Sequence, residues 1–391
     1  MHIGDNEGLF PSMRALSLHW RIETNHMKKT SMKQIGILTG GGDCPGLNAV
    51  IRVVAKTAIG DYGLRVIGFK DGYEGLVKDE YIELRNTIVS GIVNLGGTIL
   101  GASNTGNPYR FPSNEGKRLA IRDRSKEAIA TYRRHELDCL IVVGGDGTLS
   151  IASKLIKDGL RIVAVPKTID NDLAETEFTF GFESAVVTAT EAIDKLHSTA
   201  QSHHRVMILE VMGRYAGWIA LFSGVAGGGD IILIPEIPYD IKKIARKVEE
   251  RHHSGKRFSI IVAAEGAKPR GGKLTVAKIV EASTDKIRLG GVANTLADAI
   301  EKTAGLETRA TILGHLQRGG SPTPFDRNLA TRYGYEALKL AVAGKFGRMV
   351  ALKNGRLTSV PIELSIAHLK LVPLDHPLIE VARSLGTSFG D

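Results

Sequence analysis

The sequence predicts an α/β fold built on mainly parallel sheets. Short apolar runs rich in Val and Ile alternate with longer amphipathic segments, an order typical of parallel strands covered by helices on both faces. The chain has 391 residues, more than a single core usually supports, which favours two or three domains. Many of its 45 glycines stand in short loops directly after the apolar runs, where ligands bind in such folds.

Seven apolar runs have the length and composition of strands that are buried on both faces. They are residues 33–39, 65–69, 138–143, 161–165, 205–211, 230–234 and 257–263. The amphipathic segments predict helices at residues 48–59, 149–157, 183–199, 241–252, 293–303 and 326–343. Residues 1–32 lack both periodicities, and Met32 directly precedes the first strand. We therefore expect residues 1–32 to form a disordered extension.

The charge and the cysteines narrow the class of protein. A formal charge of +9 favours partners that carry negative charge, but no long run of Lys and Arg is interleaved with aromatics, which argues against nucleic acid. The longest stretch without charge, between Arg214 and Asp230, holds 15 residues; this is too short to span a bilayer, so no membrane partner is expected. Cys44 and Cys139 are the only cysteines, which fits a reducing cytoplasm.

The first glycine loop covers residues 40–48 and reads Gly-Gly-Gly-Asp-Cys-Pro-Gly-Leu-Asn. Consecutive glycines let a ligand approach the backbone closely, and their N–H groups can surround phosphate oxygens. The helix that follows adds the positive end of its dipole. The loop lacks the Gly-Lys-Ser/Thr ending of a Walker loop. A tight turn between strand and helix, with no ligand, would also account for these glycines.

The second loop, residues 144–148, reads Gly-Gly-Asp-Gly-Thr. An Asp among glycines at a strand end is well placed to bind Mg²⁺ while backbone amides contact phosphates. The structural alternative is that Asp146 only caps the next helix. The same motif occurs in NAD kinases and diacylglycerol-type lipid kinases, so on its own it leaves several families open.

The third loop, residues 166–172, reads Pro-Lys-Thr-Ile-Asp-Asn-Asp and places two carboxylates two residues apart. A positioned Asp can take the proton that an acceptor hydroxyl loses during phosphoryl transfer. On its own, Asp-Asn-Asp would more often form a turn. Arginines beside glycines, which suit bidentate phosphate binding, follow within residues 203–217, 307–309 and 314–320.

Taken together, these segments resemble the 6-phosphofructokinase family, whose motifs occur in the same order over residues 33 to about 345. This joint pattern decides against the NAD and lipid kinases, which share only the second loop. The resemblance implies two similar three-layer α/β domains with mainly parallel sheets and an active site in the cleft between them. It assigns residues 33–181 and about 317–365 to a domain that binds ATP and Mg²⁺, residues 182–316 to a domain that binds the sugar phosphate, and about 366–391 to a C-terminal tail.

The resemblance also implies an activity, the ATP-dependent phosphorylation of the 1-hydroxyl of fructose 6-phosphate, and a role for each matching residue. Asp170 matches the catalytic base, Asp146 the Mg²⁺ ligand, and Asp172 a position close to the chemistry. The positions that match donor-binding residues are Gly42, Tyr73, Asp146, Gly147 and Thr148. Those that match sugar-contacting residues, some of which also assist catalysis, are Thr168, Met212, Gly213, Arg214 and Glu265. The sugar-phosphate cluster is Arg205, Arg309, His315 and Arg318. Family members lend the equivalents of Arg205 and Arg309 to a neighbouring subunit, which implies a homodimer or homotetramer.

The sequence departs from the best-known bacterial ATP enzymes of the family in three places. Asn104 stands where those enzymes have a catalytically helpful arginine, and Arg110 is a candidate replacement. Lys167 replaces a glycine and resembles members that use pyrophosphate. In the effector pocket Arg52 is retained, but Lys56 and Asp230 replace an arginine and a glutamate, so the usual allosteric regulation is not assumed.

Two other functions compete with an ATP-dependent enzyme. A pyrophosphate-dependent phosphotransferase of the same family would explain Lys167. A non-catalytic regulatory subunit would bind the same ligands without turnover, but such a chain should lose Asp146, Asp170 or Asp172, and all three are present. Gly147 favours ATP, because pyrophosphate-using relatives usually carry Asp there, where it would block the α-phosphate.

Overall fold

A computed structural model describes residues 28–115, 118–280 and 287–391 of the chain. Most of the extension predicted at residues 1–32 lies outside these described residues. Its last residues, which are described, contact the body of the protein: Lys28 pairs with Asp61 at 2.6 Å, and Met32 packs against the main hydrophobic core.

The larger of two main sheets has seven strands in the order β15-β14-β7-β6-β1-β2-β3. The five inner strands are parallel, and β3 and β15 are antiparallel at the two edges. The inner strands are almost completely buried, as expected for parallel strands covered on both faces. Their bounds are β1 Gln34–Thr39, β2 Arg65–Phe69, β3 Tyr81–Glu83, β6 Cys139–Gly144, β7 Ile162–Pro166, β14 Arg348–Lys353 and β15 Arg356–Pro361.

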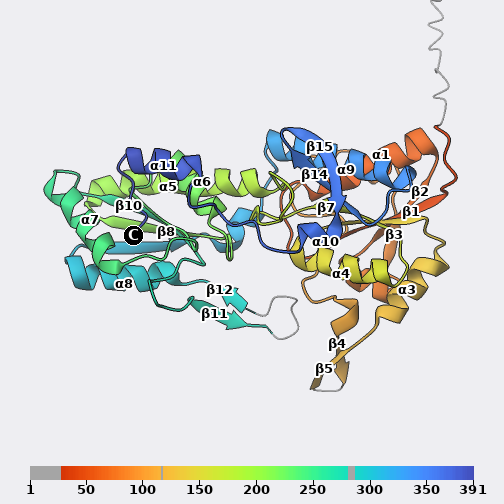
Figure 1. The fold of residues 1–391 in the computed structure, drawn as a ribbon, viewed down its shortest axis with the longest axis horizontal. Coiled ribbons are helices and arrows are strands. Elements are labelled where there is room, and N and C mark those ends of the chain that lie inside the picture. The colour runs from red at the N-terminus through yellow and green to blue at the C-terminus, as the bar shows by residue number, and fades with distance from the viewer. Residues whose placement is uncertain (1–27, 116–117, 281–286) are drawn as a thin grey trace, which may run out of the picture.

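Helices cover both faces of this sheet (Figure 1). On one face α1 (Leu47–Tyr62) packs against α9 (Pro324–Val342), and Gly334 lets the two helices approach because a Cβ there would lie 2.6 Å from a methyl of Val53. The other face is covered by α2 (Tyr73–Lys78), α3 (Ser125–Arg134), α4 (Asp146–Lys157) and α10 (Ile362–Ser365).

The smaller sheet has four parallel strands in the order β13-β8-β10-β9. Their bounds are β8 Val206–Val211, β9 Ile231–Leu233, β10 Ser259–Ala264 and β13 Thr308–Ile312. One face is covered by α5 (Phe182–His203), α6 (Trp218–Ala226) and α11 (Pro377–Ser384), and the other by α7 (Ile241–His253) and α8 (Val292–Ala304) (Figure 1). The predicted α/β fold with mainly parallel sheets is therefore confirmed.

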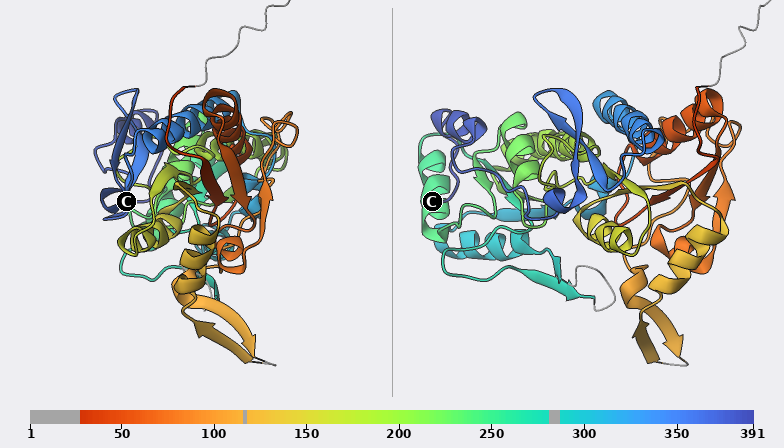
Figure 2. Two further views of the ribbon diagram at one scale, coloured as in Figure 1. Left: turned by 90° about the vertical axis from the view of Figure 1, so that its right-hand side faces the viewer. Right: turned by 45° about the vertical axis from the view of Figure 1, so that its right-hand side comes forward.

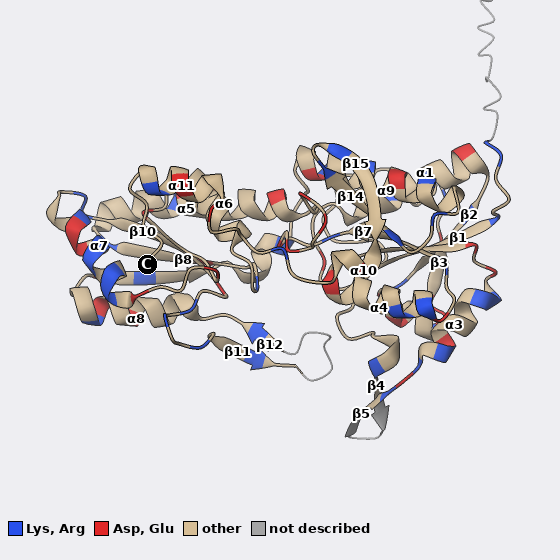
Figure 3. Cartoon of the chain, viewed as in Figure 1, with Lys and Arg blue, Asp and Glu red and all other residues tan. Residues whose placement is uncertain are grey.

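Two antiparallel hairpins project from the same side of the molecule (Figure 2). One is formed by β4 (Phe111–Glu115) and β5 (Arg118–Arg122), preceded by the short 3₁₀ helix η1 (Pro108–Arg110). The other is formed by β11 (Val276–Ile279) and β12 (Ile287–Leu289) and lies below the junction of the two sheets. It carries basic side chains (Figure 3).

All seven predicted strands and all six predicted helices form, with ends that differ by a few residues. The most useful difference is that α4 begins at Asp146, so the Asp-Gly-Thr part of the second glycine loop forms the first helical turn. The part of the chain predicted to be a C-terminal tail packs on the smaller sheet, where Ser388 bridges to Ile231 and Phe389 is completely buried. None of the described helices is long and apolar enough to cross a membrane.

Candidate active site

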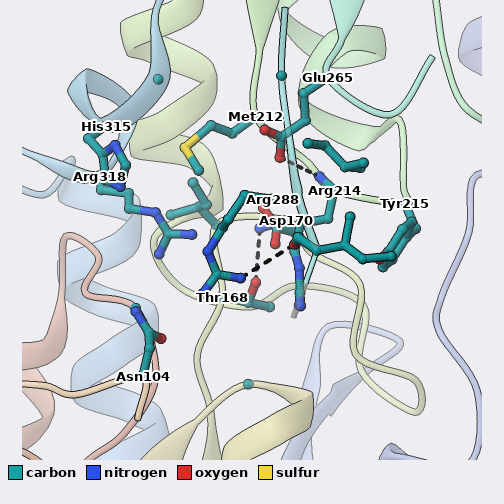
Figure 4. A pocket seen from close by; sticks show the side chains of 18 of the residues that line it. Asn104, Thr168, Asp170, Met212, Arg214, Tyr215, Glu265, Arg288, His315 and Arg318 are labelled. Atoms are coloured by element: carbon teal, nitrogen blue, oxygen red, sulfur yellow. Dashed lines mark hydrogen bonds between the residues drawn. The ribbon is translucent and has the colours of Figure 1, made fainter. Parts of the chain in front are cut away.

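Loops from both sheets line a cavity of about 710 Å³. The larger sheet contributes the loops that follow β1, β6 and β7, and the smaller sheet contributes the end of β8 and the loops after β8, β10 and β13. These are the carboxyl ends of parallel strands, where ligands bind in open α/β sheets. Figure 4 shows side chains from both halves of the molecule pointing into the same space.

The first glycine loop forms one wall of the cavity because other groups lie directly against its backbone. A Cβ at Gly40 would lie 2.6 Å from a methyl carbon of Thr148, and a Cβ at Gly42 would lie 1.9 Å from Nη1 of Arg318. Gly41 has a φ of 76°, a conformation that L side chains rarely adopt. The glycines thus allow two distant segments to approach this loop.

Asp146, Gly147 and Thr148 line the cavity at the start of α4. The N–H groups of this first turn and the helix dipole favour an anion. The Asp146 carboxylate lies 3.4 Å from Nη1 of Arg214, which comes from the other half of the molecule.

Tyr73 is placed differently from the expectation that it binds the donor. Its side chain is buried, it does not line the cavity, and its hydroxyl donates to the Thr148 carbonyl at 2.9 Å. Tyr73 therefore stabilises the first turn of α4 through this hydrogen bond.

The acidic loop after β7 places Asp170 in the wall of the cavity. The Asp170 N–H donates to the Thr168 hydroxyl at 3.0 Å. Its side chain is almost completely buried, and among the described residues its Oδ1 has no hydrogen-bond partner. Such an oxygen is costly to leave unpaired and marks a place for a ligand hydroxyl. Burial raises the pKa of Asp170, whereas the guanidinium groups of Arg318 and Arg214 lower it.

Asp172 is buried next to the same loop but does not line the cavity. Burial, with repulsion from Asp170 and Asp146, raises its pKa to about 7. Between the two carboxylates Asn171 has a left-handed backbone, with a φ of 52°. The acidic loop thus exposes one carboxylate to the cavity and encloses the other.

The smaller sheet supplies Met212, Arg214 and Glu265 to the cavity. Arg214 has a φ of 50°, and its N–H donates to Oε1 of Glu265 at 3.0 Å. Burial raises the pKa of Glu265 to about 7, and repulsion from Asp170 adds to this effect. Gly213 does not line the cavity; its φ of 139° and a Cβ position only 2.6 Å from the Ala216 carbonyl show that it shapes the turn.

His315 and Arg318 line the cavity from the 3₁₀ helix η2 (Gly314–Arg318). Nη1 of Arg318 donates to the Asp43 carbonyl at 3.2 Å. Arg318 therefore joins this helix to the first glycine loop, and its positive charge lies near Asp170.

Two arginines predicted to bind the sugar phosphate are not part of this cavity. Arg205 and Arg309 do not line it, and both pair with Glu307, at 2.9 and 2.5 Å respectively. Arg110, the candidate replacement for the missing arginine, also does not line the cavity, although Asn104 does.

Several residues that line the cavity were not among the predicted site residues. Lys167 is buried, and its ammonium donates to the Gly42 carbonyl. Glu210 caps α8 by accepting from the N–H groups of Gly291 and Ala293, both at 2.9 Å. Arg288 enters the cavity from β12 (Figure 4). Lys167 had a signal in the sequence because it stands in the acidic loop, and Glu210 because it stands at the end of a predicted strand.

The carboxylates fit a Mg²⁺ ion that is bound largely by its substrate. The described residues contain no group of three or more His, Cys, Asp or Glu side chains that could hold a metal. Mg²⁺ commonly takes one or two carboxylates and completes its coordination with phosphate oxygens and water. Asp146, beside a phosphate-binding helix start, fits that pattern.

Comparison with known proteins identifies the family. The phosphofructokinase family model matches residues 34–341. "ATP-dependent 6-phosphofructokinase 2" of Clostridium perfringens is 52% identical over 365 residues, which cover 92% of this chain and 99% of that protein. The "ATP-dependent 6-phosphofructokinase" of Spirochaeta thermophila is 48% identical over 93% and 100% of the two chains.

Solved structures agree with this assignment. The structure of phosphofructokinase from Saccharomyces cerevisiae matches with a TM-score of 0.71 and 29% identity, over 92% of this chain and 47% of that chain. This chain thus spans about half the length of the yeast chain. Because the family model and the relatives cover nearly the whole body of the protein, the chain belongs to the phosphofructokinase family.

Proposed function

We propose that this protein is an ATP-dependent 6-phosphofructokinase of glycolysis that acts in the cytoplasm. It transfers the terminal phosphoryl group of ATP to the 1-hydroxyl of fructose 6-phosphate. The observation that carries the proposal is the unpaired, buried Oδ1 of Asp170 in a cavity that also holds two glycine loops and several cationic side chains. The names of relatives that are about half identical over their full length support the same activity.

In this proposal Asp170 acts as the general base. Its Oδ1 accepts the proton of the 1-hydroxyl while the hydroxyl oxygen attacks the γ-phosphorus and ADP leaves. Burial raises the pKa of Asp170 toward the range in which a base is most effective. Thr168, which accepts from the Asp170 N–H, fixes the orientation of the loop.

The charges around Asp170 suit the phosphoryl donor. The first turn of α4 and the first glycine loop offer N–H groups to its phosphates. Arg214, 3.4 Å from Asp146, offers a guanidinium close to the same place. Mg²⁺, held by Asp146 and the phosphate oxygens, would neutralise the charge that develops during transfer.

The sugar phosphate is bound on the other side of Asp170. Met212 and Glu265 contact the sugar, and His315 and Arg318 bind its 6-phosphate. Arg205 and Arg309, which lie outside this chain's own cavity, reach the phosphate of a neighbouring subunit in a homodimer or homotetramer. This arrangement makes each site a joint product of two chains.

Pyrophosphate is the alternative donor, and Gly147 and Lys167 point in opposite directions. Gly147 has no side chain to obstruct a nucleotide at the start of α4. Lys167, the feature that favours pyrophosphate, already donates to the Gly42 carbonyl and so has a structural use in the glycine loop. We therefore assign ATP as the donor.

Measurement of kcat/KM for fructose 6-phosphate phosphorylation with each donor tests the assignment. The value with ATP should exceed that with pyrophosphate. Gly147→Asp should abolish ATP use through steric clash and charge repulsion, and a second change, Lys167→Gly, should not restore it. A higher value with pyrophosphate would overturn the donor assignment, and no turnover with either donor would support a non-catalytic subunit.

A further inference from the structure

Residues 369–372, near the C-terminus, lie against the acidic loop. Leu369 bridges to Leu173, and the Lys370 N–H donates to the Asp172 carbonyl at 2.8 Å. This segment is nearly 200 residues from the acidic loop in the sequence. It was predicted only as part of a tail, yet it directly contacts the loop that carries the proposed base.

The Lys370 side chain has three acceptors and no spare N–H. Its Nζ donates to Oδ1 of Asn171 at 3.0 Å, to the Thr176 carbonyl at 2.9 Å and to the Glu177 carbonyl at 2.8 Å. Three acceptors match the three donors of an ammonium group, whereas a neutral amine has two. Burial lowers the pKa of Lys370 to about 7, and attraction to the Asp172 carboxylate opposes this effect. The three acceptors are the geometric reason to expect the ammonium form at this position.

Asn171 is the link between Lys370 and the proposed base. Its side chain is almost completely buried, and Oδ1 also accepts from the Thr179 N–H at 3.0 Å. Its left-handed backbone turns the chain between Asp170 and Asp172. Asn adopts such a backbone more readily than most residues other than glycine, and the contacts of its side chain fix it there.

The same segment is fastened to the smaller sheet on its other side. Nε1 of Trp218 donates to the Lys370 carbonyl at 2.7 Å. Oε1 of Glu236 accepts from the Val372 N–H at 2.9 Å and from the Gly217 N–H at 3.0 Å. The acidic loop is therefore connected through Lys370 to the start of α6, which covers the smaller sheet.

We propose that Lys370 is a positioning residue that holds Asp170 in place for phosphoryl transfer. It does so through its hydrogen bond to Asn171 and by connecting the acidic loop to the smaller sheet. Lys370 does not line the cavity and acts through Asn171. This inference rests on the proposed function, because it assigns Asp170 as the base. Displacement of the base by about 1 Å is enough to lower turnover on the order of a hundredfold.

The test compares Lys370→Met with a matched control, Lys353→Met. Lys353 also pairs with a carboxylate close to the acidic loop, Glu175 at 2.5 Å, but it is half exposed and, among the described residues, forms no hydrogen bond with Asn171. In Lys370→Met we expect kcat with ATP and fructose 6-phosphate to fall between about tenfold and a hundredfold, with KM values within about threefold of the wild type. Lys353→Met should keep kcat within about twofold, because exposed ion pairs contribute little.

A second set of variants covers the case in which Lys370→Met folds poorly. Asn171→Ala should lower kcat by a similar factor, and the double variant Lys370→Met/Asn171→Ala should lose little more, because both changes break one connection. Lys370→Arg, which keeps the charge, should recover part of the lost kcat. Equal kcat values in Lys370→Met and Lys353→Met would overturn the inference. It would also be overturned if Lys370→Met and Asn171→Ala lowered kcat independently of each other in the double variant. An inactive wild type would instead contradict the proposed function.

Discussion

At the scale of single residues, the proposed chemistry depends on one carboxylate oxygen. Asp170→Asn keeps the shape of the side chain but cannot accept the proton of the sugar hydroxyl. We expect kcat to fall on the order of a hundred- to ten-thousandfold. Calorimetric titration should show that fructose 6-phosphate still binds with nearly unchanged affinity. A variant that retained more than about a tenth of the wild-type kcat would show that Asp170 is not the base.

The pKa of Asp170 leads to a second prediction about a residue. Burial raises this pKa and the Arg318 guanidinium lowers it, so Arg318→Gln should raise it further. The base works only when deprotonated, and activity is lost as the pH falls through its pKa. The acidic limb of the kcat/KM profile should therefore move to higher pH in Arg318→Gln.

A matched control separates this effect from the loss of a phosphate ligand. His315→Gln removes another proposed phosphate ligand, but His315 is not one of the groups that mainly shift the pKa of Asp170. It should lower kcat/KM with little movement of the acidic limb. An unmoved limb in Arg318→Gln would show that Asp170 does not control the pH dependence.

The residues that line the cavity could be predicted from sequence where they stand in a continuous motif. Asp146, Thr168 and Asp170 stand in two short loops, and all three line the cavity. Lys370 could not be found, because nothing near it in the chain indicates that its ammonium reaches Asn171. Tyr73 contacts the second glycine loop but is buried beneath it. A sequence motif does not show in which direction a side chain points.

At the scale of elements, the β11–β12 hairpin adds a cation that the motifs do not include. Arg288 on β12 lines the cavity, where Asn104 provides no charge (Figure 4). The cavity is proposed to bind two phosphorylated ligands, so the loss of a cation should weaken their binding. Arg288→Ala should therefore lower kcat/KM by about tenfold or more, the effect usually seen when a hydrogen bond to a charged group is lost.

The control for this prediction is Arg356→Ala. Arg356 is an exposed arginine at the start of β15, part of another hairpin, and does not line the cavity. Its loss should leave kcat/KM and the melting temperature nearly unchanged. Equal kinetics in the two variants would show that the β11–β12 hairpin does not contribute to ligand binding.

The elements that sequence predicted well are the ones buried on both faces. β1, β6, β7, β8 and β10 are continuous apolar runs, and burial requires that composition. The edge strand β3 and the hairpin strands β11 and β12 are three or four residues long, and none of their residues is buried. Their residues are not constrained by a core, so no periodicity indicated them.

At the scale of the whole molecule, the two-sheet organisation required information beyond local patterns. No Pro- or Ser-rich linker separates the two halves, and α9 with β14 and β15 returns to the larger sheet after the smaller one is complete. Helix and strand order alone cannot reveal such a return, because the pairing of β14 with β7 is a long-range contact. It was the family resemblance that predicted this return of the chain to the first domain.

The proposed sharing of active sites between subunits can be tested by mixing two inactive variants. Arg309 pairs with Glu301 and Glu307 outside its own cavity, so its proposed phosphate ligand belongs to another subunit. Asp170→Asn and Arg309→Ala should each be nearly inactive alone. After subunit exchange, a site with Asp170 from one variant and Arg309 from the other is intact. Random mixing gives about a quarter of such sites in a symmetric oligomer with shared sites. The mixture should therefore regain about a quarter of wild-type activity.

Subunit exchange must be verified independently, for example by native mass spectrometry of one labelled and one unlabelled variant. A mixture of Asp170→Asn with His315→Ala serves as the control. Asp170 and His315 line the cavity of the same chain. The proposal does not place His315 across the interface, so a neighbouring subunit does not supply the missing histidine. Activity should stay at the level of the two separate variants, because each site takes both side chains from one chain and therefore lacks one of them. Recovery in the Arg309 mixture without recovery in the His315 mixture is the result that only an active site shared between subunits explains, and failure of the Arg309 mixture after proven exchange would place Arg309 outside the active site.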